Sequence, residues 1–84
     1  MFLLFLVEQR TQARISNSTI RDGHTDIEPL FDDTGIVPAN LPQNLEGIKN
    51  ASANVIDGLL TTYNQPLNGN LVARKKRLAK FLGL

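Results

Sequence analysis

The chain contains no cysteine and no tryptophan, and only five of its 84 residues are aromatic. Without cysteine it can form neither a disulfide framework nor a thiolate metal site. At this length folding removes only about 60 to 65% of the unfolded chain's surface from water. The sequence therefore allows one modest hydrophobic core, and further stabilisation has to come from self-association or from docking to another molecule.

The residue patterns that accompany catalysis are also missing. No serine stands in a nucleophile-elbow motif beside a plausible base, and no glycine-rich loop could cradle a phosphate. The one histidine, His24, lies among carboxylates whose spacing differs from that of a calcium loop, so a solvated acidic turn is favoured over a metal site. The sequence therefore predicts a protein that is not an enzyme and has no catalytic residue, metal, cofactor or small-molecule substrate.

The longest apolar run, from Phe2 to Val7, is too short to span a membrane. No basic region precedes it, and Glu8 follows it in place of a small-residue cleavage site, so a secretory signal peptide is a poor fit. Two glycosylation sequons, at Asn17 and Asn50, then have no bearing on the protein. The expected location is the cytoplasm, of the cell itself or of a host, or a virion.

Composition divides the chain into three segments. Residues 1–15 combine the apolar run with mostly helix-forming residues, which favours a helix, although six apolar residues would also suit a buried strand. Residues 16–39 contain closely spaced glycine, proline, asparagine and aspartate, so we expect a long extended acidic segment. Its isolated apolar residues could anchor it on a partner or pack against the chain's own helices: Ile27, Leu30, Phe31, Ile36 and Val37.

Residues 40–84 are predicted to form a helical hairpin. Asn40 can cap the first helix, Asn64 can end it near residue 63, and a break near Gly58 is compatible with the low helix propensity of glycine. Its apolar face is longer than a short second helix could cover, so the N-terminal run or another chain must bury it. The predicted partner-binding residues on this face are Leu41, Leu45, Ile48, Val55, Ile56, Leu59 and Tyr63.

The second helix of the hairpin is predicted from residue 71 to about residue 82, antiparallel to the first, with Asn70 as its cap and Gly83 as its stop. Its positive charges surround most of the helix. They could bind nucleic-acid phosphates or an acidic partner, or could simply complement the helix dipole and keep the chain soluble. The predicted nucleic-acid or acidic-partner site consists of Arg74, Lys75, Lys76, Arg77 and Lys80.

The formal charge of +1 conceals an unequal distribution along the chain. Residues 1–40 carry three basic and six acidic side chains, whereas residues 41–84 carry six basic and two acidic ones. One interpretation is that the acidic segment lies against the basic helix, within one chain or between copies. Exposed ion pairs contribute only about 0 to 1 kcal/mol each, so such contacts would orient segments more than stabilise them.

Together these patterns predict an all-α protein with a helix near the N-terminus, a long extended acidic segment and a small C-terminal helical hairpin. The favoured function is a non-catalytic structural or interaction subunit of a larger assembly, such as a virion or a multi-subunit complex. It would dock onto another protein or a second copy through the amphipathic helix and the extended segment. The alternative is a small nucleic-acid-binding protein that uses the basic helix, and a peripheral protein of anionic membranes is the third and least favoured hypothesis.

Overall fold

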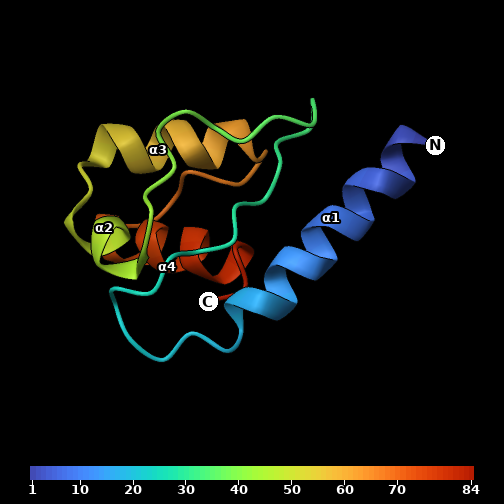
Figure 1. The fold of residues 1–84 in the computed structure, drawn as a ribbon. Coiled ribbons are helices and arrows are strands. Elements are labelled where there is room, and N and C mark those ends of the chain that lie inside the picture. The colour runs from blue at the N-terminus through green and yellow to red at the C-terminus, as the bar shows by residue number, and fades with distance from the viewer.

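The computed structural model describes all 84 residues and contains four helices and no β-sheet (Figure 1). The helices are α1 (Phe2–Asn17), α2 (Leu45–Asn50), α3 (Ala53–Thr62) and α4 (Leu71–Phe81). Between α1 and α2 the chain forms no regular element apart from one isolated bridge, which joins Asp26 and Asn44. The predicted all-α class is therefore confirmed as a compact, mostly helical fold.

α1 includes the whole apolar run, so the helix interpretation of residues 1–15 is confirmed and the strand alternative is wrong. The helix ends without a glycine. Instead, the hydroxyls of Ser18 and Thr19 donate hydrogen bonds of 2.7 and 2.9 Å to the carbonyl oxygens of Ile15 and Ser16. These bonds satisfy carbonyls that lack a partner inside the last turn, so the polar Ser-Asn-Ser-Thr sequence stops α1.

The single helix predicted from residue 41 to residue 63 is wrong, because the structure has two helices there. α2 is capped by Asn44, not Asn40: the Asn44 side chain accepts a 2.8 Å hydrogen bond from the Gly47 amide. Ser52 then caps α3 in the same way, accepting from the Val55 amide at 3.3 Å. Each polar side chain offers the backbone a partner at the start of a new helix, so the break falls at Ser52 and not at Gly58.

α4 begins where the sequence predicts, with the Asn70 side chain accepting a 2.8 Å hydrogen bond from the Ala73 amide. It packs against both α2 and α3. Asp57, halfway along α3, lies against Arg74 in the first turn of α4, and just beyond the end of α3 the ring of Tyr63 lies 4.8 Å from that of Phe81 at the end of α4. The two helices therefore run in the same direction, and the predicted antiparallel hairpin is wrong (Figure 1).

The connection between α3 and α4 explains this direction. Instead of a tight turn, residues 63–70 run back along the pair of helices to the start of α4 (Figure 1). Arg77 donates hydrogen bonds of 2.9 and 2.8 Å to the carbonyl oxygens of Pro66 and Asn68. Arg74 donates a 2.7 Å bond to the carbonyl oxygen of Gly69. Side chains of the basic helix thus hold the connection that leads into it.

The hydrophobic core lies where α3 and α4 meet the second half of α1 and the segment between α1 and α2. That segment contributes Ile27 and Leu30, so part of it packs inside its own chain. Ile36 and Val37, further along, remain exposed. The core cluster consists of Ala13, Ile27, Leu30, Ile48, Ile56, Leu59, Leu60, Tyr63, Leu78 and Leu82.

Candidate interaction surfaces

The second half of α1 holds residues 28–33 by side-chain hydrogen bonds to their backbone. The Gln9 amide donates to the Pro29 carbonyl oxygen at 2.8 Å and accepts from the Phe31 amide at 2.9 Å. Arg10 donates to the Phe31 carbonyl oxygen at 3.0 Å and forms a 3.0 Å ion pair with Asp33. Buried or partly buried backbone groups need hydrogen-bond partners. Here the side chains of α1 supply the partners that a neighbouring β-strand would otherwise provide.

At the end of α1, Asn17 joins three parts of the chain. It is 1% exposed and accepts from the Glu28 amide at 2.7 Å, while its own amide donates to the carbonyl oxygens of Glu28 and Leu82 at 3.0 and 2.7 Å. One turn earlier, Arg14 donates to the Phe81 carbonyl oxygen at 2.8 Å and lies 4.7 Å from the centre of that ring. We call Gln9, Arg10, Arg14 and Asn17 the polar clamp. Sequence reasoning missed it, since polar residues on a helix are normally solvated.

The apolar face predicted to bind a partner is largely covered by the chain itself. Tyr63 shows how: its hydroxyl donates a 2.7 Å hydrogen bond to the Leu30 carbonyl oxygen inside the core. Four of the seven predicted side chains are at most 2% exposed, and these are Ile48, Ile56, Leu59 and Tyr63. The other three are partly exposed, and these are Leu41, Leu45 and Val55. In this fold the four buried side chains are not available to a partner, because the segment between α1 and α2, together with α4, covers them.

The five predicted basic residues do not form one surface either. The Arg74 Nε lies 2.8 Å from the Asp57 Oδ1 in an ion pair. Neither of these two atoms has another hydrogen-bond partner. Arg74 and Arg77 also hold the connection before α4, and the Lys75 ammonium group donates to the carbonyl oxygen of Lys49. Only two of the five side chains are exposed and unpaired, namely Lys76 and Lys80.

A groove of about 350 Å³ lies between α2 and α4. Three lysines stand around it, and the remaining side chains are apolar. Val72 is 62% exposed, whereas the other apolar residues of the groove, Leu45, Ile48 and Ala79, are partly or fully buried. We call this site the lysine-rimmed groove, and it is lined by Leu45, Ile48, Lys49, Val72, Lys75, Lys76 and Ala79.

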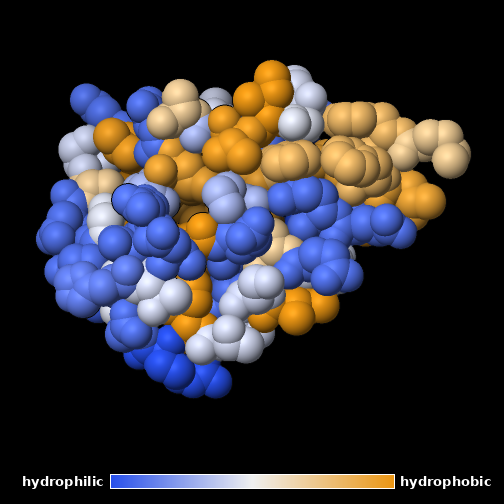
Figure 2. Space-filling view, viewed as in Figure 1, coloured by the Kyte–Doolittle hydropathy of each residue, from blue (hydrophilic) through white to orange (hydrophobic).

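The first half of α1 exposes nearly all of its apolar side chains. Leu3 and Leu4 are 71% and 58% exposed, and only Leu6 is buried. The ring of Phe2 lies close to Gly35, where an added Cβ would come within 3.0 Å of it. The apolar area therefore continues from the helix to the neighbouring loop (Figure 2). We call it the N-terminal apolar surface, and it consists of Phe2, Leu3, Leu4, Phe5, Val7, Ile36 and Val37.

This surface is the exposed feature that the list of sequence-predicted site residues did not include. The sequence identified the apolar run, but left open whether this run or another chain covers the apolar face of the next helices. Because a helix turns by 100° per residue, six consecutive apolar residues point in all directions around it. They cannot all face one core. From this geometry alone, the sequence could have predicted that part of the apolar run stays exposed.

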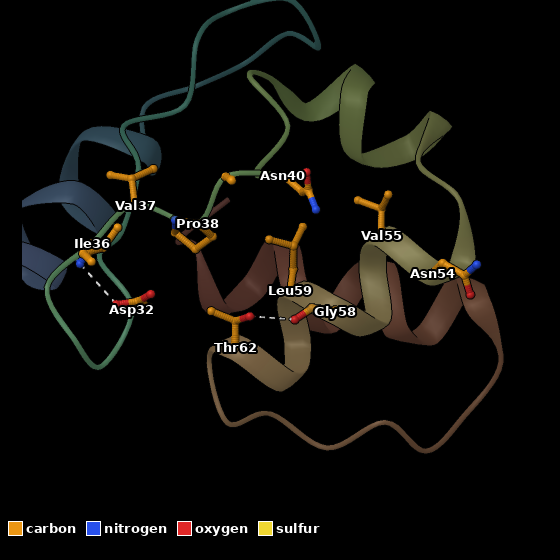
Figure 3. Close-up of a pocket in the computed structure, with 11 residues that line it drawn as sticks. Asp32, Ile36, Val37, Pro38, Asn40, Asn54, Val55, Gly58, Leu59 and Thr62 are labelled. Atoms are coloured by element: carbon orange, nitrogen blue, oxygen red, sulfur yellow. Dashed lines mark hydrogen bonds between the residues drawn. The ribbon is translucent and has the colours of Figure 1, made fainter.

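A second groove, of about 370 Å³, lies between residues 32–40 and α3 (Figure 3). The Asp32 carboxylate at its edge accepts hydrogen bonds from the hydroxyl and amide of Thr34, at 2.6 and 2.8 Å, and from the Ile36 amide at 3.1 Å. These bonds, the Thr34 hydroxyl foremost, lower the pKa of Asp32. The Thr62 hydroxyl donates to the Gly58 carbonyl oxygen. Asp32 Oδ1 and the Thr62 hydroxyl are thus both engaged in hydrogen bonds within the chain.

The acidic stretch around His24 forms an exposed turn. Asp22 accepts hydrogen bonds from the amides of His24 and Thr25, at 2.8 and 2.9 Å, and from the Thr25 hydroxyl at 3.0 Å. The bond from the His24 amide contributes most to lowering the pKa of Asp22. Nowhere in the molecule do three or more histidine or carboxylate side chains gather into a possible metal site.

Comparison with protein-family models, with curated proteins and with solved structures gave no match. None of the four helices combines the length and the hydrophobicity that a membrane span requires. What the chain does must therefore be inferred from its own surfaces.

Proposed function

We propose that the chain is a non-catalytic interaction protein, a small structural subunit of a larger assembly, and that it docks through the N-terminal apolar surface. The observation that carries this proposal is the exposure of four consecutive apolar residues: Phe2, Leu3, Leu4 and Phe5 are each at least 50% exposed. They lie on a helix end that projects beyond the other three helices (Figure 1). A contiguous apolar area of this kind commonly marks an interaction site.

The size of the effect can be judged from the transfer of apolar side chains out of water. Full burial of a large apolar side chain contributes roughly 1.5 to 3 kcal/mol. Five side chains in α1 that are about half exposed therefore leave on the order of 5 kcal/mol of burial unused. Association costs about 4 to 15 kcal/mol, so this surface supports docking only if further contacts assist it.

The charges near the N-terminal apolar surface favour a protein partner over an anionic membrane. Glu8 follows the apolar run directly, and Asp32 and Asp33 lie in the loop that carries Ile36 and Val37. The nearest cation on α1, Arg10, is paired with Asp33. Surfaces that bind anionic lipid carry an excess of lysine and arginine, and this one carries an excess of carboxylates.

The nucleic-acid alternative receives less support from the same geometry. A protein that tracks a phosphate backbone needs several free cations on one side. Three of the five predicted cations donate hydrogen bonds within the chain, so Lys76 and Lys80 are the two left free for phosphates. We therefore do not propose nucleic-acid binding as a second function.

A photo-reactive amino acid at position 3 tests the proposed function, with the same group at the exposed position 61 on α3 as the matched control. In extracts of the source organism, the probe at Leu3 should yield one discrete protein adduct, while the probe at Thr61 should yield none. Circular dichroism first establishes that both labelled chains are folded. The proposal fails if Leu3 gives no adduct, if both positions give the same adducts, or if lipid is the molecule captured.

A further inference from the structure

We infer that the partner is a second copy of this chain: the N-terminal apolar surface of one copy docks into the lysine-rimmed groove of the next. This inference rests on the proposed function and adds the identity of the occupant. The groove contains no acidic side chain, and its wall includes the exposed Val72. Lys49, Lys75 and Lys76 stand around it. It therefore suits an occupant that is apolar in the middle and negatively charged at its margin.

The N-terminal apolar surface has this composition. No charged side chain occurs between Phe2 and Val7. Its margin carries three carboxylates, those of Glu8, Asp32 and Asp33, and one guanidinium group, that of Arg10. Arg10 is already bound to Asp33 and to the Phe31 carbonyl oxygen. The margin thus carries an excess of negative charge where the groove carries three positive charges, and opposite charges at the rim select and orient partners.

A copy cannot fill its own groove. Figure 1 places α2, which forms one side of the groove, at the far side of the molecule from the N-terminal end of α1. The second half of α1 is fixed by the polar clamp, so the helix cannot swing across. The contact must therefore join two different surfaces on two copies, which makes it a heterologous, head-to-tail contact.

The charges also disfavour the simplest alternative, a symmetric pairing of two N-terminal apolar surfaces. That pairing would bring together two surfaces whose margins both carry the excess negative charge of Glu8, Asp32 and Asp33. Like charges facing each other across an interface are unfavourable. A head-to-tail contact places carboxylates against lysines instead, and it repeats from copy to copy unless the rotation closes a ring.

Complementary variants test this arrangement in the purified protein. Leu4→Glu damages the N-terminal apolar surface and leaves the groove intact, whereas Val72→Glu damages the groove and leaves that surface intact. Both positions are more than half exposed, so neither change empties the core. Thr61→Glu, an equally charged change at an exposed site of α3, is the matched control. Molar mass is measured by light scattering over a range of concentrations after circular dichroism has established folding.

The wild-type chain and Thr61→Glu should increase in mass with concentration beyond that of a dimer. Leu4→Glu and Val72→Glu should each shift this association to concentrations about tenfold higher or more. An equimolar mixture of the two variants should form a dimer and nothing larger, because it contains one intact surface and one intact groove per pair. If Leu4→Glu does not fold, Leu3→Glu replaces it, since Leu3 is 71% exposed.

Three outcomes would overturn the inference, and they separate it from the proposed function. If Val72→Glu associates like the wild type while Leu4→Glu does not, the N-terminal surfaces pair symmetrically. If the wild type stays monomeric while the probe at Leu3 captures a different protein, the docking surface stands and the self-association is wrong. If the mixture of variants stays monomeric although the wild type associates, the groove is not the acceptor.

Discussion

In the first half of α1, four apolar side chains from Phe2 to Phe5 are at least half exposed, whereas in the second half the polar side chain of Asn17 is fully buried and that of Arg14 is partly buried. One continuous helix thus exposes apolar side chains at one end and buries a polar side chain at the other. The difference separates two environments along one helix. Polar side chains of the second half hold other segments of the chain, and the first half leaves the apolar side chains that we propose as a docking surface.

The physical reason lies in the segment that packs against the polar half. Residues 28–33 have no neighbouring β-strand, so their backbone amides and carbonyls must find other partners. Gln9, Arg10 and Asn17 supply those partners, which leucine or phenylalanine in the same places could not do. Over the first half of α1 the Phe31 ring, 6.0 Å from that of Phe5, and the loop at Gly35 approach, and they leave most of the apolar surface exposed.

The largest expected effect is that of Asn17→Ala in the polar half. It removes three hydrogen bonds, one buried and two partly buried, and leaves two carbonyl oxygens and one amide without these partners. We expect the free energy of unfolding to fall by roughly 3 kcal/mol or more, measured by urea denaturation. Gln12→Ala, at an exposed position of the same helix, is the control and should change it by less than about 0.5 kcal/mol. Equal effects at the two positions would mean that buried Asn17 matters no more to the fold than a solvated side chain of the same helix.

A smaller effect is expected at Tyr63, which holds the same extended segment from the opposite side. Tyr63→Phe leaves the Leu30 carbonyl oxygen without its hydrogen-bond donor, and should cost about 1 to 3 kcal/mol in urea denaturation. An effect near zero would mean that the extended segment depends on the polar clamp alone. The substitution leaves the ring in place, so the packing of the core is preserved.

Tyr63 also gives the protein a pH dependence with a definite sign. Burial raises the pKa of Tyr63 to about 12, above the value of about 10 that it has in the unfolded chain. The folded state therefore retains the phenol proton longer, so this part of the stability is complete below about pH 10 and is lost as the pH rises towards 12. Tyr63 is the only tyrosine, so an absorbance titration observes it alone. The Phe variant should lack this loss, and equal pH profiles for the two proteins would contradict the assignment.

The smallest effect on stability is expected in the apolar half. Leu3→Gln and Leu4→Gln alter side chains that are 71% and 58% exposed, so each should change the free energy of unfolding by less than about 0.5 kcal/mol. The same variants should elute earlier from a hydrophobic-interaction column than the wild type. A destabilisation as large as that of Asn17→Ala would show that the N-terminal apolar surface belongs to the fold and not to recognition.

Several local features could be predicted from the sequence because they depend on a few neighbouring residues. Asn70 starts α4 as expected, and Gly83, with φ of 90°, follows its end. The positions of the breaks were harder to predict, since Asn40 and Asn44 have the same side chain and only one of them caps a helix. The parallel course of α3 and α4 also escaped prediction, because it depends on arginines that hold a connecting segment some distance away in the chain.

By itself the sequence determined the helical class, the position of the apolar run and the impossibility of disulfides, all of which follow from composition and local spacing. Only the tertiary structure decided which apolar residues are available to a partner. Leu4 and Ile56 are both apolar helix residues, yet one is 58% exposed and the other is 0% exposed. The reason is that burial depends on which distant segments pack over a side chain, and residues 27–33 cover α3 while leaving the first turns of α1 largely bare.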